Sequence, residues 1–261
     1  MARVYIGTSG WQYSHWKGIF YPAYLSYKDW LKFYSKYFKT VEVNSSFYGQ
    51  TKASTFEKWK LEVPPNFVFS IKANRYITHV KKLKGCQEAV KVFFDSANTL
   101  LTNRQTKVSV CDVILWQFPP SLKKDIKRLR SFLELLPKTF RHAFEFRHPS
   151  WVDKDTLISL IQSRLETTVV FQDWKDWPSF EDYTRLIEPE QLSKLPFIYL
   201  RFHGREQLYI SCYSDEELAN WGKSMQKWKS IGVDVYAYFN NDALGYAVDN
   251  ALRLINLIQS G

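Results

Sequence analysis

The chain has 261 residues, of which 45% are hydrophobic and 24% are charged, and its net charge is +10. This composition is typical of an ordinary soluble globular protein. It excludes a membrane-spanning chain, because no apolar stretch approaches the ~20 residues needed to cross a bilayer. The three cysteines are odd in number, far apart and in no C-x-x-C spacing, which argues against a disulfide framework and a zinc knuckle.

The N-terminus begins directly with the β-branched run "VYIGTSG" and carries nothing that resembles a targeting signal. We therefore expect a cytoplasmic protein with no membrane partner. The composition leaves the oligomeric state open.

Eight short apolar or alternating runs follow one another along the chain, with helical or mixed stretches between most of them. Strands are predicted at residues 3–9, 40–46, 67–74, 112–118, 141–148, 167–173, 197–204 and 234–242, and helices with one apolar stripe at 26–38, 121–132 and 214–228. This repeated strand and helix alternation predicts an α/β fold, a single (β/α)8 TIM-type barrel over residues 1–261, with some helices irregular or shortened.

A doubly wound open sheet is the alternative fold. It is weakened because no G-x-G-x-x-G or G-x-x-x-x-G-K-[ST] turn follows any predicted strand. We predict no bound cofactor.

Two predicted loops are rich in aromatic residues. The first is "SGWQYSHWKGIFYP" after strand one, which contains Trp11 and Trp16, and the second is "QDWKDWPSFEDY" after strand six. At the mouth of a barrel such rings would stack on a ligand. Alternatively, they form a hydrophobic plug over the rim.

The fifth predicted strand, within "HAFEFRHPSW", alternates Phe144 and Phe146 with Glu145 and Arg147. In a barrel the apolar face of a strand packs on the helices, so the charged face points inward. The same rule predicts a polar interior made of Glu42, Asn44, Ser70, Lys72, Asn74, Gln117, Glu145, Arg147, Arg201, His203, Tyr236, Tyr238 and Asn240. Most of these residues lie toward the C-terminal ends of their strands, where barrel enzymes assemble their active sites.

This constellation predicts a pocket that receives an anion and contains an acid/base carboxylate. We predict that Glu145, His203 and Lys72 are catalytic, and that Asn44, Arg147, Arg201, Asn240, Trp11 and Tyr238 bind the substrate. Glu145 is expected to lie within ion-pair reach of Lys72, Arg147 or Arg201, because an isolated buried carboxylate would be protonated. The alternative is a structural layer of salt bridges that closes the barrel without doing chemistry.

The positive charge is concentrated in the first part of the chain. Residues 1–141 contain 24 Lys and Arg against 9 Asp and Glu, whereas residues 142–261 contain 12 against 17. Much of this charge is expected on solvated helix faces. It also predicts an anionic partner, either a small molecule or nucleic acid, and leaves a non-catalytic nucleic-acid-binding module as an alternative to an enzyme.

A metal site was weighed against the pattern of potential ligands. His79, His148 and His203 follow predicted strands, and Glu42, Glu145 and Asp173 are available as carboxylates. These residues share no H-x-x-x-H or H-x-H spacing, so we predict no metal.

The end of strand eight suggests a site for an anion such as phosphate. We expect Asn240, Asn241 and Asp242 to cap the following helix and leave its first N–H groups near the end of strand seven, where Arg201, His203, Gly204 and Arg205 lie. The carboxylate of Asp242 counts against this site, because it could occupy the place of the anion.

Several runs, taken in order, resemble the YecE-like family, domain of unknown function family 72. They are "IGTSGW", "YPAYL", "VEVNSSFYG", "FSIKANRYITH", "QFPPSLK", "FEFRHPSW", "YLRFHG" and "YFNND". The resemblance covers essentially the whole chain and implies a TIM-type barrel. It supplies no reaction, although a likeness in shape to endonuclease IV makes a metal-dependent phosphodiesterase a further alternative.

Overall fold

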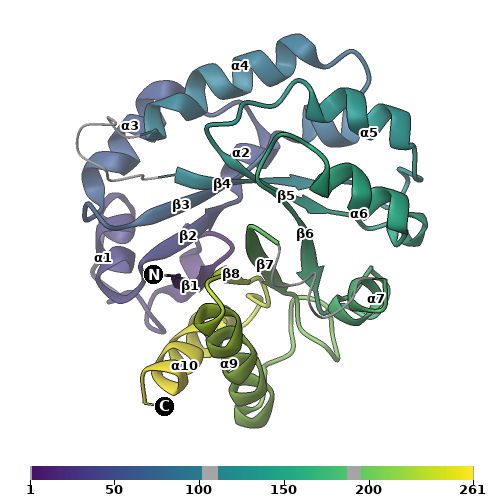
Figure 1. The fold of residues 1–261 in the computed structure, drawn as a ribbon. Helices are drawn as coiled ribbons and strands as arrows, with labels where there is room; N and C mark the ends of the chain where they lie inside the picture. Colours follow the sequence, from purple (N-terminus) through teal and green to yellow (C-terminus); the bar gives the residue numbers. More distant parts are fainter. Residues whose placement is uncertain (1, 102–110, 187–194, 261) are drawn as a thin grey trace.

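Eight parallel strands form a nearly closed barrel in the computed structural model, which describes residues 2–101, 111–186 and 195–260. The strands are β1 Val4–Thr8, β2 Thr40–Val43, β3 Val68–Lys72, β4 Cys111–Gln117, β5 Arg141–Glu145, β6 Thr167–Gln172, β7 Phe197–Phe202 and β8 Asp234–Phe239. They pair in the order β1-β8-β7-β6-β5-β4-β3-β2 (Figure 1). A single bridge between Ser9 and Glu42 joins the two ends of this order. The predicted barrel is confirmed, and the open doubly wound sheet is wrong.

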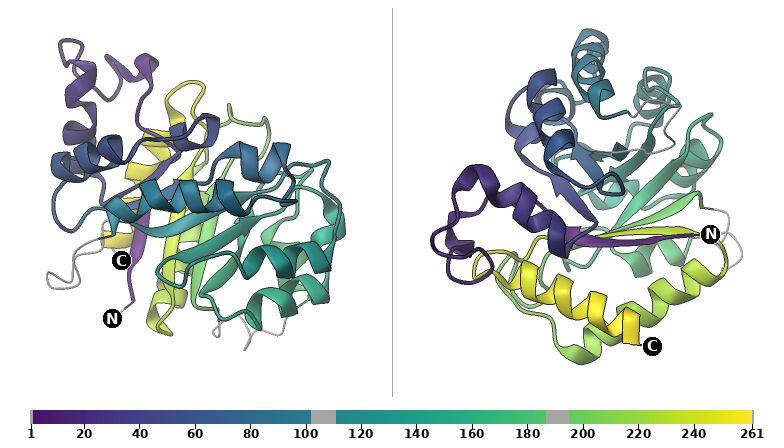
Figure 2. Two further views of the ribbon diagram at one scale, coloured as in Figure 1. Left: turned by 90° about the horizontal axis from the view of Figure 1, so that it is seen from above. Right: turned by 90° about the vertical axis from the view of Figure 1, so that its left-hand side faces the viewer.

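Helices surround the strands, as Figures 1 and 2 show. They are α1 Trp30–Tyr37, α2 Ser45–Tyr48, α3 Ala53–Glu62, α4 Gln87–Ala97, α5 Ile126–Leu133, α6 Lys154–Ile161, α7 Phe180–Thr184, α9 Asp215–Ser230 and α10 Tyr246–Ser260. The last two lie side by side along β8 and β1. Within the described ranges, no helix combines the length and apolar character needed to span a bilayer.

The predicted first residue agrees with the structure for one of the three helices and differs for the other two. The helix predicted at 214–228 is α9, and its Ser214 and Glu217 form the expected capping box. The helix predicted at 121–132 begins only at Ile126, because the Asp125 side chain accepts a hydrogen bond from the backbone N–H of Arg128. The helix predicted at 26–38 begins with a 3-10 turn over Tyr27–Asp29, and α1 follows it.

The barrel interior has three levels along its axis. At the N-terminal end, the Arg141 guanidinium lies 2.7 Å from Asp234, and the Tyr236 hydroxyl donates to Asp112 at 2.5 Å. We call Asp112, Arg141, Asp234 and Tyr236 the basal cluster. The middle level is largely apolar and fully packed, and its members are Tyr5, Val68, Val113, Leu115, Ala143, Val170, Phe197, Tyr199 and Tyr238 together with the Tyr236 ring. The third level, at the C-terminal end, is polar.

The outer faces of the strands pack on the helices. Phe144 and Phe146 lie in this outer core, where Phe146 stacks on Trp151 with ring centroids 4.6 Å apart. Glu145 points to the other side and is fully buried. The alternation predicted for strand five is therefore confirmed, and it places a carboxylate inside the barrel.

Gly7 lies where β1 and β2 come together and leaves no room for a side chain. A Cβ atom at this position would lie 2.4 Å from the backbone oxygen of Thr40. We expect Gly7→Ala to push the strands apart and lower the free energy of unfolding by about 1–3 kcal/mol, measured by urea denaturation. Gly49→Ala is the matched control, because no other described residue beyond its chain neighbours comes within 4 Å of its Cβ position and its φ of −159° suits any residue. Equal losses in the two variants would contradict the steric explanation.

Candidate active site

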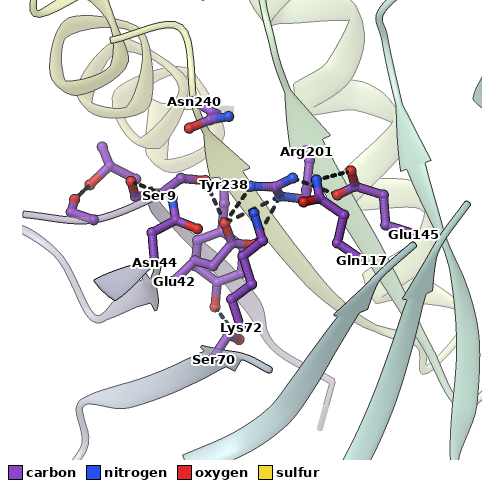
Figure 3. Close-up of polar contacts among 12 residues, drawn as sticks. Ser9, Glu42, Asn44, Ser70, Lys72, Gln117, Glu145, Arg201, Tyr238 and Asn240 are labelled. Atoms are coloured by element: carbon purple, nitrogen blue, oxygen red, sulfur yellow. Dashed lines mark hydrogen bonds and ion pairs between the residues drawn. The ribbon is translucent and has the colours of Figure 1, made fainter. Parts of the chain in front are cut away.

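The polar level of the barrel is organised around Arg201, near the end of β7. Its side chain is fully buried between two carboxylates that come from opposite parts of the sheet, Glu42 on β2 and Glu145 on β5 (Figure 3). The distances are 2.8 Å from Nη2 to Oε1 of Glu42, 3.0 Å from Nε to Oε2 of Glu42, and 2.5 Å from Nη1 to Oε2 of Glu145. We call Glu42, Arg201 and Glu145 the ionic layer.

Further hydrogen bonds satisfy Glu42. It accepts from the Ser9 hydroxyl at 2.6 Å and from the Tyr199 hydroxyl at 2.7 Å. Glu42 lies in the interior as predicted, but its pairing with Arg201 was not predicted. Strand parity gives the direction of a side chain, and it does not say which strand across the barrel supplies the partner.

Glu145 is held equally firmly. It accepts from Gln117 Nε2 at 2.6 Å and from Arg147 Nε at 2.8 Å, in addition to Arg201. The predicted ion pair is therefore confirmed. Burial alone would raise the pKa of Glu145, but the charges of Arg201 and Arg147 hold this pKa well below its ordinary range. The side chain stays ionised at neutral pH and has no proton to donate.

Lys72, at the end of β3, differs from every member of the ionic layer. It is 8% exposed, and its amino group points toward Arg201 and Glu42 (Figure 3). Its Nζ lies 4.1 Å from the centre of the Phe47 ring, and no residue of the described ranges forms a hydrogen bond or ion pair with it. Burial, together with the positive charge of Arg201, lowers the pKa of Lys72 to about 7. A large share of this amine is thus uncharged at neutral pH.

The charges of the polar level do not balance when Lys72 is protonated. Two buried carboxylates face two arginines, Arg201 and Arg147, which already neutralise them. A protonated Lys72 adds one positive charge that no carboxylate of the described residues pairs with. An anion bound at this level would compensate it.

Four buried polar atoms at the C-terminal ends of strands lack partners in the described residues, and they belong to Asn44, Gln172, His203 and Asn241. The Oδ1 atom of Asn44, which follows β2, has none in the described part of the chain, although its Nδ2 donates to the backbone oxygen of Ser9 at 3.0 Å. The Nε2 atom of His203, which follows β7, also has none. Buried polar atoms of this kind are uncommon in native proteins and often mark functional sites.

The protonation of His203 follows from its surroundings. Burial and the charge of Arg201 keep its pKa well below the ordinary value, so the ring is neutral. Its Nδ1 lies 3.1 Å from Nδ2 of Asn240. With this amide donating to Nδ1, the ring proton lies on Nε2, which is then a buried donor without an acceptor. Lys72 is among the charges that act on this ring.

The β6–α7 loop contributes a ring to this end of the barrel. The guanidinium carbon of Arg147 lies 3.6 Å from the centre of the Trp177 ring, and Trp177 meets His203 edge to face at 5.1 Å. Trp177 belongs to the Trp-rich segment at 172–183, but it was not among the predicted site residues. Only the fold shows that this ring stacks on Arg147.

Trp11 and Tyr238 were predicted to bind substrate. Trp11 is 3% exposed and packs edge to face against Trp59 at 5.0 Å, so the first loop forms the hydrophobic plug rather than a stacking platform. The Tyr238 hydroxyl bonds to Thr40 and Ser70 in the barrel interior, at 2.7 and 2.8 Å. The Tyr238 hydroxyl is thus already used by two partners, and the Trp11 ring is almost wholly buried.

The predicted cap after strand eight is wrong. Helix α10 begins at Tyr246, and a turn closed by a hydrogen bond from Gly245 N to Asp242 O separates it from the Asn-Asn-Asp run. Asp242 instead accepts from the indole N–H of Trp16 at 2.7 Å and lies 2.9 Å from His15. The expected phosphate site on the first N–H groups of this helix therefore loses its basis.

The residues weighed as metal ligands have other contacts. His148 Nδ1 lies 2.9 Å from the Ser150 hydroxyl, His79 Nδ1 lies 2.8 Å from the Thr78 hydroxyl, and Asp173 accepts from the backbone N–H of His203 at 2.8 Å. In the part of the chain that the structure describes, no group of three or more His, Cys, Asp or Glu is placed to hold a metal ion.

Comparison with known proteins gives relatives over the full length. The chain is 28% identical to UPF0759 protein YunF of Bacillus subtilis, over 98% of this chain and 94% of that protein. It is 25% identical to UPF0759 protein YecE of Escherichia coli K12 over 58% of this chain. A DUF72 family protein of Thermotoga maritima has a similar crystal structure, with a TM-score of 0.81, 29% identity, and coverage of 98% of this chain and 99% of that one.

Structures outside these relatives share only the fold. SacUVDE has a TM-score of 0.59 at 12% identity, covering 100% of this chain and 99% of that one. The sequence also matches the family described as "Protein of unknown function DUF72" over residues 5–261. The chain thus belongs to the DUF72 family.

Proposed function

We propose that this protein is an enzyme that transfers protons on a small anionic molecule at the C-terminal end of the barrel, with Lys72 as the acid/base group. One observation carries the proposal. Lys72 is buried against the Phe47 ring with no hydrogen-bond or ion-pair partner among the described residues, in a layer where arginines already neutralise both carboxylates. A lysine kept only for stability would be paired or exposed, because an unpaired buried charge is costly. A pKa near the working pH is what proton transfer requires.

The other residues receive roles from their contacts. Among the described residues Arg147 bonds to Glu145 through Nε, so its terminal nitrogens can hold the anionic group of the substrate. His203 Nε2 and Asn44 Oδ1 offer one buried donor and one buried acceptor to orient the substrate. Glu145, first predicted as the acid/base residue, takes the role of positioning Arg147 and Arg201, since its pKa is held low.

A panel of small anions tests the proposal. Inorganic phosphate, simple carboxylates, 2-oxo acids and sugar phosphates would be added to the purified protein, and thermal unfolding would be recorded. Proton NMR in D₂O would then show whether any stabilising compound exchanges a C–H proton. We expect at least one compound that raises Tm and exchanges a proton, with the exchange abolished in Lys72→Met.

Arg147→Gln is expected to weaken binding of that compound at least tenfold, about 1.4 kcal/mol, whereas Arg128→Gln is the control. Arg128 lies on α5 and pairs with Asp125, so its replacement should leave binding unchanged. The proposal would be overturned if anions raise Tm equally in the natural protein and in the Lys72 and Arg147 variants. It would also be overturned if no compound raises Tm or exchanges a proton. Stabilisation by an oligonucleotide alone would favour a nucleic-acid-binding module.

A further inference from the structure

We infer that Lys72 forms a covalent imine with its substrate, which is therefore an aldehyde or ketone that also carries a carboxylate or phosphate group. The inference rests on the proposed function and extends it, because it names the class of substrate and a bond between substrate and protein.

The surroundings of Lys72 are those that activate an amine as a nucleophile. A lysine becomes reactive when it is desolvated in an apolar environment or lies beside another cation. Lys72 meets both conditions, since the Phe47 ring lies 4.1 Å from its Nζ and its amino group points toward Arg201. No carboxylate of the described chain is within ion-pair distance to hold the amine in its charged form.

The lowered pKa supports this geometry. An ordinary lysine with a pKa of ~10.4 is uncharged in fewer than about one in a thousand molecules at pH 7. Lys72, with its pKa at about 7, is uncharged in roughly half. Its nucleophilic form is therefore far more abundant at neutral pH than that of an exposed lysine.

The reaction balances without an oxidant or reductant. The Nζ lone pair attacks the carbonyl carbon and forms a C–N bond, and the carbonyl oxygen becomes a hydroxyl group by taking a proton. This hydroxyl then leaves as water after it gains a second proton, while the nitrogen lone pair forms the C=N bond. The product is a protonated imine that keeps one hydrogen on nitrogen, so one of the two protons comes from the amine and the other from solvent.

The remaining groups fit this chemistry. The Nε2–H of His203 is an unpartnered buried donor suited to the carbonyl oxygen, and Asn44 Oδ1 is an unpartnered acceptor for a hydroxyl or N–H group. The protonated imine carries a positive charge, as a protonated Lys72 does, and it needs a negative charge nearby. An anionic group on the substrate, held by Arg147, supplies it.

Reductive trapping tests the inference. The full-length protein would be incubated at pH 7 with pyruvate, glyoxylate or glycolaldehyde phosphate and sodium cyanoborohydride, which reduces an imine to a stable secondary amine. Intact mass and peptide mapping would then locate the adduct. We expect one adduct per chain with at least one probe, on Lys72, formed at least tenfold faster than on any other lysine.

Two variants complete the design. Lys124→Met is the matched control, because Lys124 is partly buried but pairs with Asp153 at 3.0 Å, and its loss should leave trapping unchanged. Lys72→Met should abolish the fast adduct, and the peptide map of the natural protein gives the same answer if this variant fails to fold. Adducts spread over exposed lysines, or none on Lys72 with any probe, would overturn the inference. If Lys72 is needed for C–H proton exchange but no adduct is trapped on it, the imine is wrong and the proposed function stands. If an adduct is trapped on Lys72 but no compound exchanges a C–H proton, the proton-transfer role is wrong.

Discussion

Replacing Arg201 with Met is expected to lower the free energy of unfolding by about 3–5 kcal/mol at pH 7. The change removes the shared cation between Glu42 and Glu145, both of which are fully buried. Each carboxylate must then stay charged without this partner or take up a proton, and either outcome costs folding free energy. Urea denaturation followed by circular dichroism measures the loss.

Two further variants show whether the lost charge of Arg201 causes the loss of stability. Adding Glu42→Gln and Glu145→Gln to Arg201→Met should restore a substantial part of the stability, because neutral amides tolerate burial better than unpaired carboxylates. Arg253→Met is the surface control. Arg253 pairs with Asp215 and Asp249 near the surface, so its loss should cost less than about 1 kcal/mol. If the triple variant is no more stable than Arg201→Met, lost packing rather than lost charge explains the result.

Lowering the pH should reduce the difference in the free energy of unfolding between Arg201→Met and the natural protein. The pKa of Glu145 is held well below its ordinary value in the folded state. Its contribution to stability is thus present above the pKa of the unfolded chain and is lost as the pH falls through the lower folded value. Unfolding measured between pH 7 and pH 3 should show the two proteins converging.

Lys72→Met is expected to make the protein more stable by about 1–4 kcal/mol at pH 6 while removing its activity. A pKa lowered from 10.5 to about 7 corresponds to a burial cost of at most about 5 kcal/mol for the charged form. Because the folded value lies below the unfolded one, this cost is fully present below pH 7. It diminishes as the pH rises toward 10.5, where the unfolded chain also loses the proton.

The gain in stability should therefore shrink between pH 7 and pH 10, which chemical denaturation at several pH values would show. Lys124→Met should show no such pH-dependent gain in stability, because the amine of Lys124 pairs with Asp153 at the surface. A destabilised Lys72→Met variant with an intact fold would mean that the amine has a structural partner, and both the proposed proton transfer and the imine would lose their foundation.

Strand parity predicted much of the candidate site. The alternation around Glu145 was enough to place this carboxylate inside the barrel and Phe144 outside, because a strand in a barrel has only two faces and one must match the helices. The same rule placed Lys72 and Arg201 in the interior. Repetition of strands and helices gave the barrel itself.

Pairing across the barrel and loop conformation could not be predicted. Glu42 and Arg201 are 159 residues apart and belong to strands that are not neighbours in the sheet, so no local pattern links them. The difference between a satisfied Glu145 and an unsatisfied Lys72 depends on distances of a few ångströms. The cap predicted from Asn240 to Asp242 failed because Trp16, from a loop far away in the sequence, binds Asp242.

The three levels of the barrel also decide how a molecule reaches Lys72. The buried middle level and the basal cluster separate the polar level from the N-terminal end of the barrel. If the proposed function is right, substrate and product must enter and leave on the same side, at the C-terminal end, and release of product precedes entry of the next substrate. A long polymer cannot thread through such a site. If the natural ligand is part of a chain, it must present a terminus or a single unit turned out of that chain.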